Sequence, residues 1–229
     1  MSIGDGEYIV ISTCNQLPYH HDRVKETLSE LKQLGVSFGE GAFLELSPKE
    51  ASFSVVWNGV GAKQFKTLDW SRIDELFLSD VEFVWRDIPF RLAVQFLDES
   101  SYEVLIVCSY ETVSAQPSNN GFRLVEHLAL STFGNLHPVF GCIGVERHAD
   151  GLECVRRGEC SLPVDKAFYS ADVLQRAPEV ETSLRKHSSF RSNIDGVGCY
   201  FRLTDIAEYR LIEPPTLQEQ VGRLRAYVV

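Results

Sequence analysis

The sequence lacks every short motif that marks a common catalytic or cofactor site. It contains no glycine-rich dinucleotide or phosphate loop, no H-E-x-x-H zinc motif, no G-x-S-x-G nucleophile elbow and no C-x-x-C pair. The reaction classes that depend on these motifs therefore have no support here. We therefore expect the surface of the protein, more than a pocket, to carry its function.

Positive charge is scarce as well. The 229 residues include 22 Lys and Arg against 32 Asp and Glu, a formal net charge of −10. This balance disfavours binding to nucleic acids and anionic membranes, which requires a basic patch on the protein, and it permits a basic protein partner. Long apolar runs are also missing, since stretches such as 102–108 are far shorter than the roughly 20 residues of a membrane-spanning helix. We therefore expect a soluble protein that binds neither membranes nor nucleic acid.

The cysteines indicate a reducing compartment. The first residues, MSIGDGEYIVISTC, have no basic segment before their apolar run and do not resemble a secretory signal. Most of the cysteines lie in or beside apolar β-like runs, where a free thiol packs as a small hydrophobic group. We predict a cytoplasmic protein with six free thiols: Cys14, Cys108, Cys142, Cys154, Cys160 and Cys199.

Strand-like and helix-like segments alternate along the chain. Apolar and polar residues alternate over 90–97, which indicates a strand of an antiparallel sheet with one buried face. Apolar residues at helical spacing predict helices over 20–34 and 122–133. Further strands are predicted at 8–13, 42–46, 52–57, 81–86, 102–109, 139–146, 190–194 and 197–203, and short helices at 71–77, 172–175, 179–186 and from 216 onward.

These segments predict an α+β fold, mainly an antiparallel sheet with helices packed on one face. The length suits a single domain spanning 1–229. The segment 116–121, QPSNNG, is the strongest loop signal. It would divide the domain into two subdomains, 1–115 and 122–229.

Imidazole and carboxylate side chains gather between positions 137 and 150, as His137, Glu146, His148 and Asp150. Both groups are ligands of transition metals, but their spacing matches no known site, so we expect no metal and no cofactor. The same histidines leave an enzyme as the alternative. It would be a small hydrolase in which His148 or His137 acts with a nearby carboxylate or thiol.

The three tryptophans, Trp57, Trp70 and Trp85, all lie in the first half, and acidic residues flank the last two. Tryptophan occurs in protein cores and is also a frequent anchor of protein interfaces. An aromatic anchor with an acidic rim would suit a basic partner. The predicted partner-binding residues are therefore Trp70, Asp74, Glu75, Glu82, Trp85 and Asp87.

The second half of the chain resembles a known family. NLHPVFGCIGVE follows a predicted helix, AFYSADVLQRAPEVE comes next, and FRSNIDGVGCYFRL forms a predicted hairpin. This order, over residues 120–205, is similar to the C-terminal part of immunity proteins associated with bacterial polymorphic toxins and type VI secretion effectors. The resemblance implies a cytoplasmic inhibitor that covers the active site of a cognate toxin, and it assigns no individual site residue. A structural protein that assembles through a self-complementary apolar surface is a third hypothesis.

Overall fold

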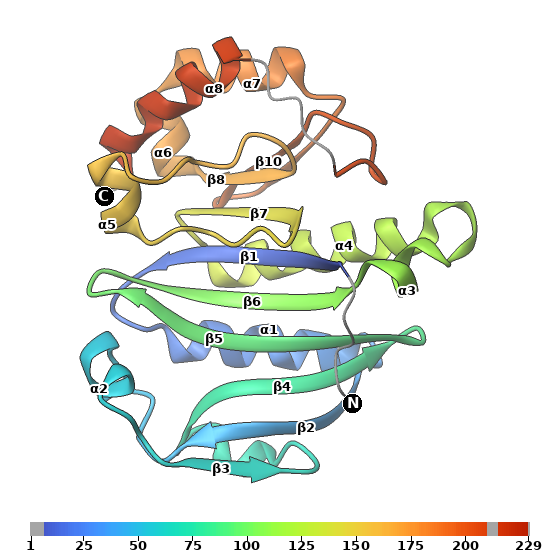
Figure 1. Cartoon of the computed structure of the whole chain (residues 1–229), viewed down its shortest axis with the longest axis vertical. Coiled ribbons are helices and arrows are strands. Elements are labelled where there is room, and N and C mark those ends of the chain that lie inside the picture. The colour runs from blue at the N-terminus through green and yellow to red at the C-terminus, as the bar shows by residue number, and fades with distance from the viewer. Residues whose placement is uncertain (1–6, 210–214, 229) are drawn as a thin grey trace.

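A ten-stranded sheet runs the length of the molecule (Figure 1). The computed structural model describes residues 7–209 and 215–228. Neighbouring strands are antiparallel, in the order β3-β2-β4-β5-β6-β1-β7-β8-β10-β9. The strands are β1 (Tyr8–Gln16), β2 (Ser37–Leu44), β3 (Ala62–Phe65), β4 (Phe77–Trp85), β5 (Ile88–Asp98), β6 (Ser101–Ser109), β7 (Phe140–Val145), β8 (Ala167–Ser170), β9 (Phe190–Ile194) and β10 (Gly198–Arg202).

Helices and short 3-10 turns connect these strands. The α-helices are α1 (His21–Gln33), α2 (Phe53–Trp57), α3 (Tyr110–Ser114), α4 (Asn120–Leu136), α5 (Leu152–Arg157), α6 (Ala171–Arg176), α7 (Pro178–His187) and α8 (Pro215–Gly222). The 3-10 turns are η1 (Trp70–Arg72), η2 (Pro117–Asn119) and η3 (Arg223–Tyr227). None of the helices in the described part of the chain has both the length and the apolar character that a membrane crossing requires.

Strand β1 lies inside the sheet, between β6 and β7. Its Ile11 pairs with Ile106 of β6 and with Ile143 of β7. Because successive side chains of a strand point to opposite faces, Ile11 enters one apolar core and Cys14 enters a second core on the other face. Strands from both halves of the chain therefore belong to one continuous sheet.

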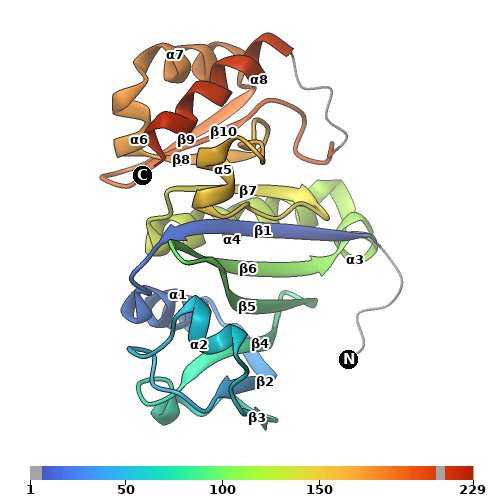
Figure 2. The same ribbon diagram turned by 60° about the vertical axis from the view of Figure 1, so that its left-hand side comes forward.

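One face of the sheet packs against α1 and α4 (Figures 1 and 2). In α1 the buried residues include Val24, Leu28 and Leu31, which recur at the helical spacing that predicted this helix. In α4, Val125 and Leu128 are buried in the same core. We call this side of the sheet the helix-covered face.

The second core lies on the opposite face, over β7, β8 and β10. Phe140, Tyr169 and Phe201 point into it, and α5, α6, α7, α8 and η3 cover it. The predicted α+β class with an antiparallel sheet is confirmed. The expectation that helices lie on one face holds only for part of the sheet. Where strands carry large apolar side chains on both faces, both faces must be shielded from water.

Two local predictions were wrong. Residues 52–57 form α2 instead of a strand, and the Ser52 hydroxyl caps it by accepting from the Val55 amide. The helix predicted over 71–77 is the short turn η1, and Phe77 already begins β4. The sequence patterns also missed α5, which lies in the polar segment after β7 and whose short amphipathic pattern gives little signal.

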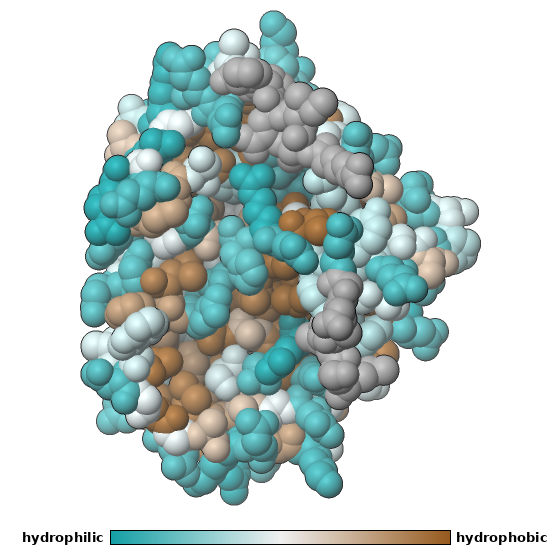
Figure 3. Space-filling view, viewed as in Figure 1, coloured by the Kyte–Doolittle hydropathy of each residue, from teal (hydrophilic) through white to brown (hydrophobic). Residues whose placement is uncertain are grey.

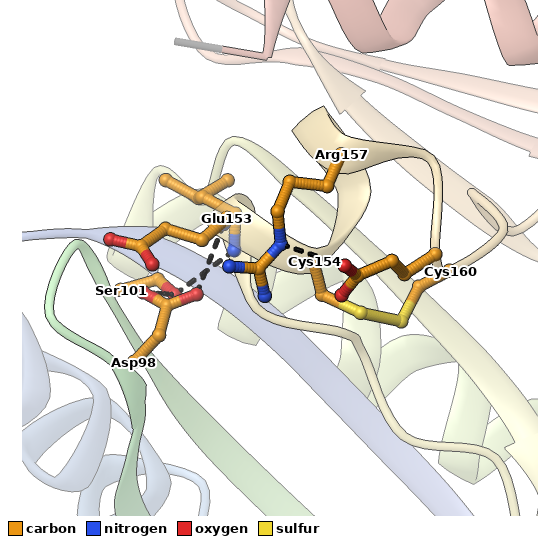
Figure 4. Close-up of a disulfide and its surroundings, with 8 residues drawn as sticks. Asp98, Ser101, Glu153, Cys154, Arg157 and Cys160 are labelled. Atoms are coloured by element: carbon orange, nitrogen blue, oxygen red, sulfur yellow. Dashed lines mark hydrogen bonds and ion pairs between the residues drawn. A yellow bond between two sulfur atoms is a disulfide. The ribbon is translucent and has the colours of Figure 1, made fainter.

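The prediction of six free thiols is wrong for two of them, because Cys154 and Cys160 form a disulfide (Figure 4). Helix α5 ends at Gly158, whose φ of 74° reverses the chain and brings the two Cα atoms to 5.6 Å. A left-handed φ of this kind is easy for glycine and costly for other residues. The other four cysteines are free and buried.

Hydrogen bonds from the β5–β6 hairpin hold the start of α5 in place (Figure 4). Asp98 Oδ2 accepts from the Glu153 amide at 3.0 Å, and Ser101 Oγ accepts from the Leu152 amide at 3.1 Å. Both amides belong to the first turn of the helix, where no intrahelical acceptor exists. The disulfide segment is therefore fastened to the sheet.

Candidate interaction surface

Strands β4, β5 and β6 leave one face without a helix from the described residues. Figure 1 views this face, with α1 behind the sheet, and Figure 3 shows apolar side chains at the surface there, mixed with hydrophilic ones. The strand register and the alternation of side chains define its members. On this open face lie Asp80, Glu82, Val84, Pro89, Arg91, Ala93, Gln95, Leu105 and Val107, with the buried Glu103 at its border.

The open face combines exposed apolar area with acidic groups. Val84 is 45% exposed. The one cationic side chain of the open face, Arg91, is already paired, since its Nη2 lies 3.0 Å from Asp80 Oδ1. Glu82 stands directly opposite Arg91 in the register of β4 and β5. The surface thus presents carboxylates whose charge is only partly offset.

A buried polar network lies beside the open face, around Glu103 of β6. The Glu103 carboxylate is fully buried and accepts hydrogen bonds from Ser12 Oγ and Gln95 Nε2. His148 Nδ1 lies 3.5 Å from the same carboxylate. The Ala149 amide donates to Ser12 Oγ at 2.6 Å. The network therefore fixes the segment after β7 against β1 and β6, with the imidazole of His148 half-exposed above a buried carboxylate.

Burial and hydrogen bonding shift the pKa values of several groups in and around this network. Hydrogen bonding to Glu103 raises the pKa of His148, because the carboxylate favours the protonated imidazole. Burial is the main reason that the pKa of the Asp150 carboxyl is raised. Burial likewise raises the pKa of the Cys142 thiol to about 12 and that of Cys14 well above its usual value. These two thiols are protonated near neutral pH.

This arrangement does not resemble a hydrolase site. The Ser12 hydroxyl is buried and donates to the Glu103 carboxylate, so it lacks the contact with a histidine that activates the nucleophile of a serine hydrolase. The nearby thiols, Cys14 and Cys142, are protonated and buried, whereas a nucleophilic cysteine needs an accessible thiolate. The network instead holds the half-exposed imidazole of His148 beside the Glu103 carboxylate.

Of the four residues that lie close in the sequence between 137 and 150, His148 and Asp150 remain near each other and near Glu103, since each charge shifts the pKa of the other group. His137 is the residue that ends α4, while Glu146 is exposed and His148 lies over Glu103. Within the described residues, no group of three or more His, Cys, Asp and Glu side chains is placed to hold a metal ion.

The two tryptophans predicted as anchors lie on the helix-covered side of the sheet. Trp85 is only 4% exposed, and its ring lies 5.9 Å from that of His127 in α4. Trp70 packs edge-on against Phe38 of β2, and Lys32 Nζ of α1 lies 4.5 Å from its ring centre. Each ring therefore contributes to packing between the sheet and a helix.

The predicted acidic residues are also dispersed. Asp74 pairs with α1, at 2.6 Å from Lys25 Nζ and 3.6 Å from His21 Nε2. Glu75 and Asp87 are exposed in turns at the two ends of β4. Of the six predicted residues, Glu82 alone lies on the open face. A partner-binding role for the other five stays a prediction.

Helix α2 carries an exposed tryptophan, Trp57, which the sequence did not predict to be a binding residue. Trp57 is 78% exposed and stacks on Phe53 at 5.6 Å, and Val55 is 41% exposed. The helix contacts β5 beside the open face (Figure 1). The five-residue run FSVVW after Ser52 has the serine cap of a helix, but its β-branched residues favoured a strand. We call Phe53, Val55 and Trp57 the aromatic edge.

Comparisons with known proteins add the following. No protein-family model matches the chain, and no curated protein matches it. A solved structure of a Pseudomonas aeruginosa T6SS protein is similar, with a TM-score of 0.49 and 10% sequence identity. The similarity covers 100% of this chain and 76% of that one. The name of that protein refers to the type VI secretion system, which the resemblance of residues 120–205 also involves. At this level of similarity the match carries no argument about function.

Proposed function

We propose that this protein is a binding protein of the immunity type, which neutralises a basic toxin or effector domain by covering its active site. The open face and the aromatic edge form the docking surface. The observation that carries the proposal is that β4, β5 and β6 leave one face without a covering helix in the described structure, beside an exposed tryptophan.

Trp57 is the expected anchor of this interface. Tryptophan is among the side chains that contribute most to binding when they leave water at a protein interface. Its stacking on Phe53 holds the ring in place before binding, so less side-chain entropy is lost. Val84 and Val107 add apolar area on the neighbouring strands.

The acidic groups favour a partner with positive charge. With a net charge of −10, the protein attracts a cationic domain over about a Debye length, roughly 8 Å at physiological salt. Glu82 on the open face and the half-exposed His148 above Glu103 are polar groups available for direct contacts. The resemblance of residues 120–205 to immunity proteins is the reason for choosing a toxin domain as the partner.

The binding test uses the purified protein and the product of the adjacent gene, with affinity measured by calorimetry. Trp57→Ala should weaken binding by about 2 kcal/mol or more, because it removes the anchor. Glu82→Lys should slow association, and association of the wild type should slow as salt is added. Glu179→Lys is the matched control, since Glu179 is exposed on α7, far along the chain from the open face.

The functional test is growth of bacteria that express the adjacent gene product with each variant. The proposal expects wild type and Glu179→Lys to protect and Trp57→Ala to protect less. Equal affinity of Trp57→Ala and wild type would remove the aromatic edge from the interface. Tight binding without protection would contradict the immunity role.

A further inference from the structure

A cavity of about 340 Å³ lies at one side of the sheet, away from the open face. It is formed where the ends of β1, α1, α4 and α6 meet, which Figure 2 brings to the left foreground, and the β9–β10 turn and Tyr227 of η3 complete it. Small-molecule sites commonly measure roughly 300–1,000 Å³. The cavity is therefore the size of a small metabolite rather than of a peptide.

The cavity collects cationic groups in a protein that is otherwise acidic. Arg23 of α1 and Arg176 of α6 line it, together with His20 and His137, against one carboxylate, Asp172. Neither arginine is ion-paired with a carboxylate of the described residues. Such groups suit anionic oxygens, which a planar guanidinium binds through two parallel hydrogen bonds.

Arg23 is held in position by the fold. Its Nη1 donates to the Leu136 carbonyl at 3.0 Å, at the last residue of α4. This contact leaves other N–H donors of the guanidinium for a ligand, since arginine carries five. Because it joins α1 to α4, the contact also keeps His20 and His137 on the same cavity wall.

Asn15 adds an acceptor without a partner to the same wall. It is 3% exposed, and its Nδ2 is committed to Thr13 Oγ1 at 2.8 Å and to the Tyr102 carbonyl at 3.4 Å. These acceptors fix the orientation of the amide, and its Oδ1 has no hydrogen-bond partner among the described residues. A buried acceptor left unpaired lowers stability by about 1–3 kcal/mol, and a hydroxyl donor that reached Asn15 Oδ1 from the cavity would remove this cost.

We propose that this cavity binds a small organic acid, a carboxylate or a phosphate monoester that also carries a hydroxyl group. Arg23 and Arg176 hold the anionic oxygens, and Asn15 Oδ1 is the acceptor for the hydroxyl. The site is separate from the docking surface and does not depend on the proposed toxin partner.

The test is calorimetry of the full-length protein in low-salt buffer with two pairs of ligands. Lactate is compared with propionate, and glycerol phosphate with propyl phosphate, so that each pair shares a charge and differs in hydroxyl groups. We expect dissociation constants in about the millimolar range, with the hydroxylated member binding more tightly. The pair that binds identifies the anionic group.

Two variants, each of which removes one positive charge, distinguish a specific site from a general effect of charge. Arg176→Gln should weaken binding about tenfold, because it removes a charge-assisted hydrogen bond. Arg191→Gln should bind as the wild type does, because Arg191 is exposed on β9 and does not line the cavity. Thermal midpoints of both variants check that each is folded.

The histidines provide an independent readout. Burial, with the charge of Arg23, lowers the pKa of His20 and of His137, while the nearby carboxylates of Asp22 and Glu26 act in the opposite direction. Both imidazoles therefore gain a proton only below their usual range, and the affinity for lactate, which stays ionised over this interval, should rise as the pH falls from 7 to 5. The proposal is overturned if neither ligand pair binds, if hydroxyl groups make no difference, or if Arg191→Gln weakens binding as much as Arg176→Gln.

Discussion

The two ends of the sheet differ in whether helices cover one face or both. Over β7, β8 and β10, helices cover both faces, and Phe140 and Tyr169 are completely buried. Over β4, β5 and β6, helices cover one face, and the other carries side chains such as Glu82, Arg91 and Gln95. Strands that are apolar on both faces require two layers of helix, whereas strands that alternate require one. The alternation therefore marks the part of the sheet that is free to meet a partner.

The largest expected difference between the two ends is in stability. Phe140→Ala, at the doubly covered end, should lower the free energy of unfolding by about 3–5 kcal/mol because it leaves a cavity in a closed core. Val84→Ala, on the open face, should change it by no more than about 0.5 kcal/mol. Urea unfolding of both variants measures the contrast, and similar losses in the two would mean that the open face is packed like a core.

The disulfide lies at the doubly covered end and should stabilise the protein. Replacing Cys154 and Cys160 together by serine should lower the free energy of unfolding by about 2 kcal/mol, the value expected for a short closed loop. Urea unfolding of the wild type in dithiothreitol should show the same loss. A double Cys108→Ala, Cys142→Ala variant is the control, and dithiothreitol should still destabilise it because its disulfide is intact.

Asp98 links the two ends, since it lies on β5 and binds the first turn of α5. Asp98→Asn places an amide where Oδ2 accepts from the Glu153 N–H, which should destabilise by about 1 kcal/mol, as other lost helix caps do. Chemical denaturation of the wild type, of Asp98→Asn and of a Glu99→Gln control at neutral pH measures this loss.

The pH dependence of the same variants tests the carboxylate itself. Burial raises the pKa of Asp98, but hydrogen bonds from Ser101, Ser100 and Glu153 outweigh it, so the folded-state pKa lies below the usual value. This group therefore contributes stability above its unfolded pKa and loses it as the pH falls through the folded pKa. Asp98→Asn should show a smaller loss in acid than the wild type, and identical acid profiles would contradict the assignment.

The smallest effect concerns His148, at the border of the two regions. Because Glu103 raises the pKa of His148, Glu103→Gln should lower that pKa toward its ordinary value, as followed by NMR titration of the imidazole. In the wild type this interaction contributes stability at pH values below the unfolded pKa of the histidine and loses it as the pH rises through the folded pKa. His187 on α7, far from Glu103, serves as the reference imidazole in the same spectra.

Local patterns predicted much of the fold. Helices α1 and α4 followed from apolar spacing, and the β9–β10 hairpin from its Asp195-Gly196 turn, because these signals depend on neighbouring residues alone. Residues 53–57 were misassigned because five residues with β-branched side chains satisfy a strand pattern, and only contacts with β5 and the Ser52 cap select the helix.

The candidate sites could be predicted much less well. The six partner residues were chosen because they are close in sequence, but a strand sends neighbours to opposite faces, so Glu82 and Trp85 point away from each other. The disulfide was missed because the cysteines lie in a polar segment whose turn at Gly158 gives little signal.

The sequence by itself determined the acidic charge, the α+β class and the faces of the regular strands and helices, because composition and periodicity are local properties. Only the tertiary structure decided which residues meet. Ser12, Glu103 and His148 come together because β1 pairs with β6 and the segment after β7 crosses both. Arg23 and Arg176 line one cavity although α1 and α6 cover opposite faces of the sheet, because the start of α1 and the end of α6 lie at the same ends of the strands. These residues are about 45 to 150 positions apart in the chain. They come together only when the sheet has formed, because its strand pairing offsets the entropy cost of closing such long loops.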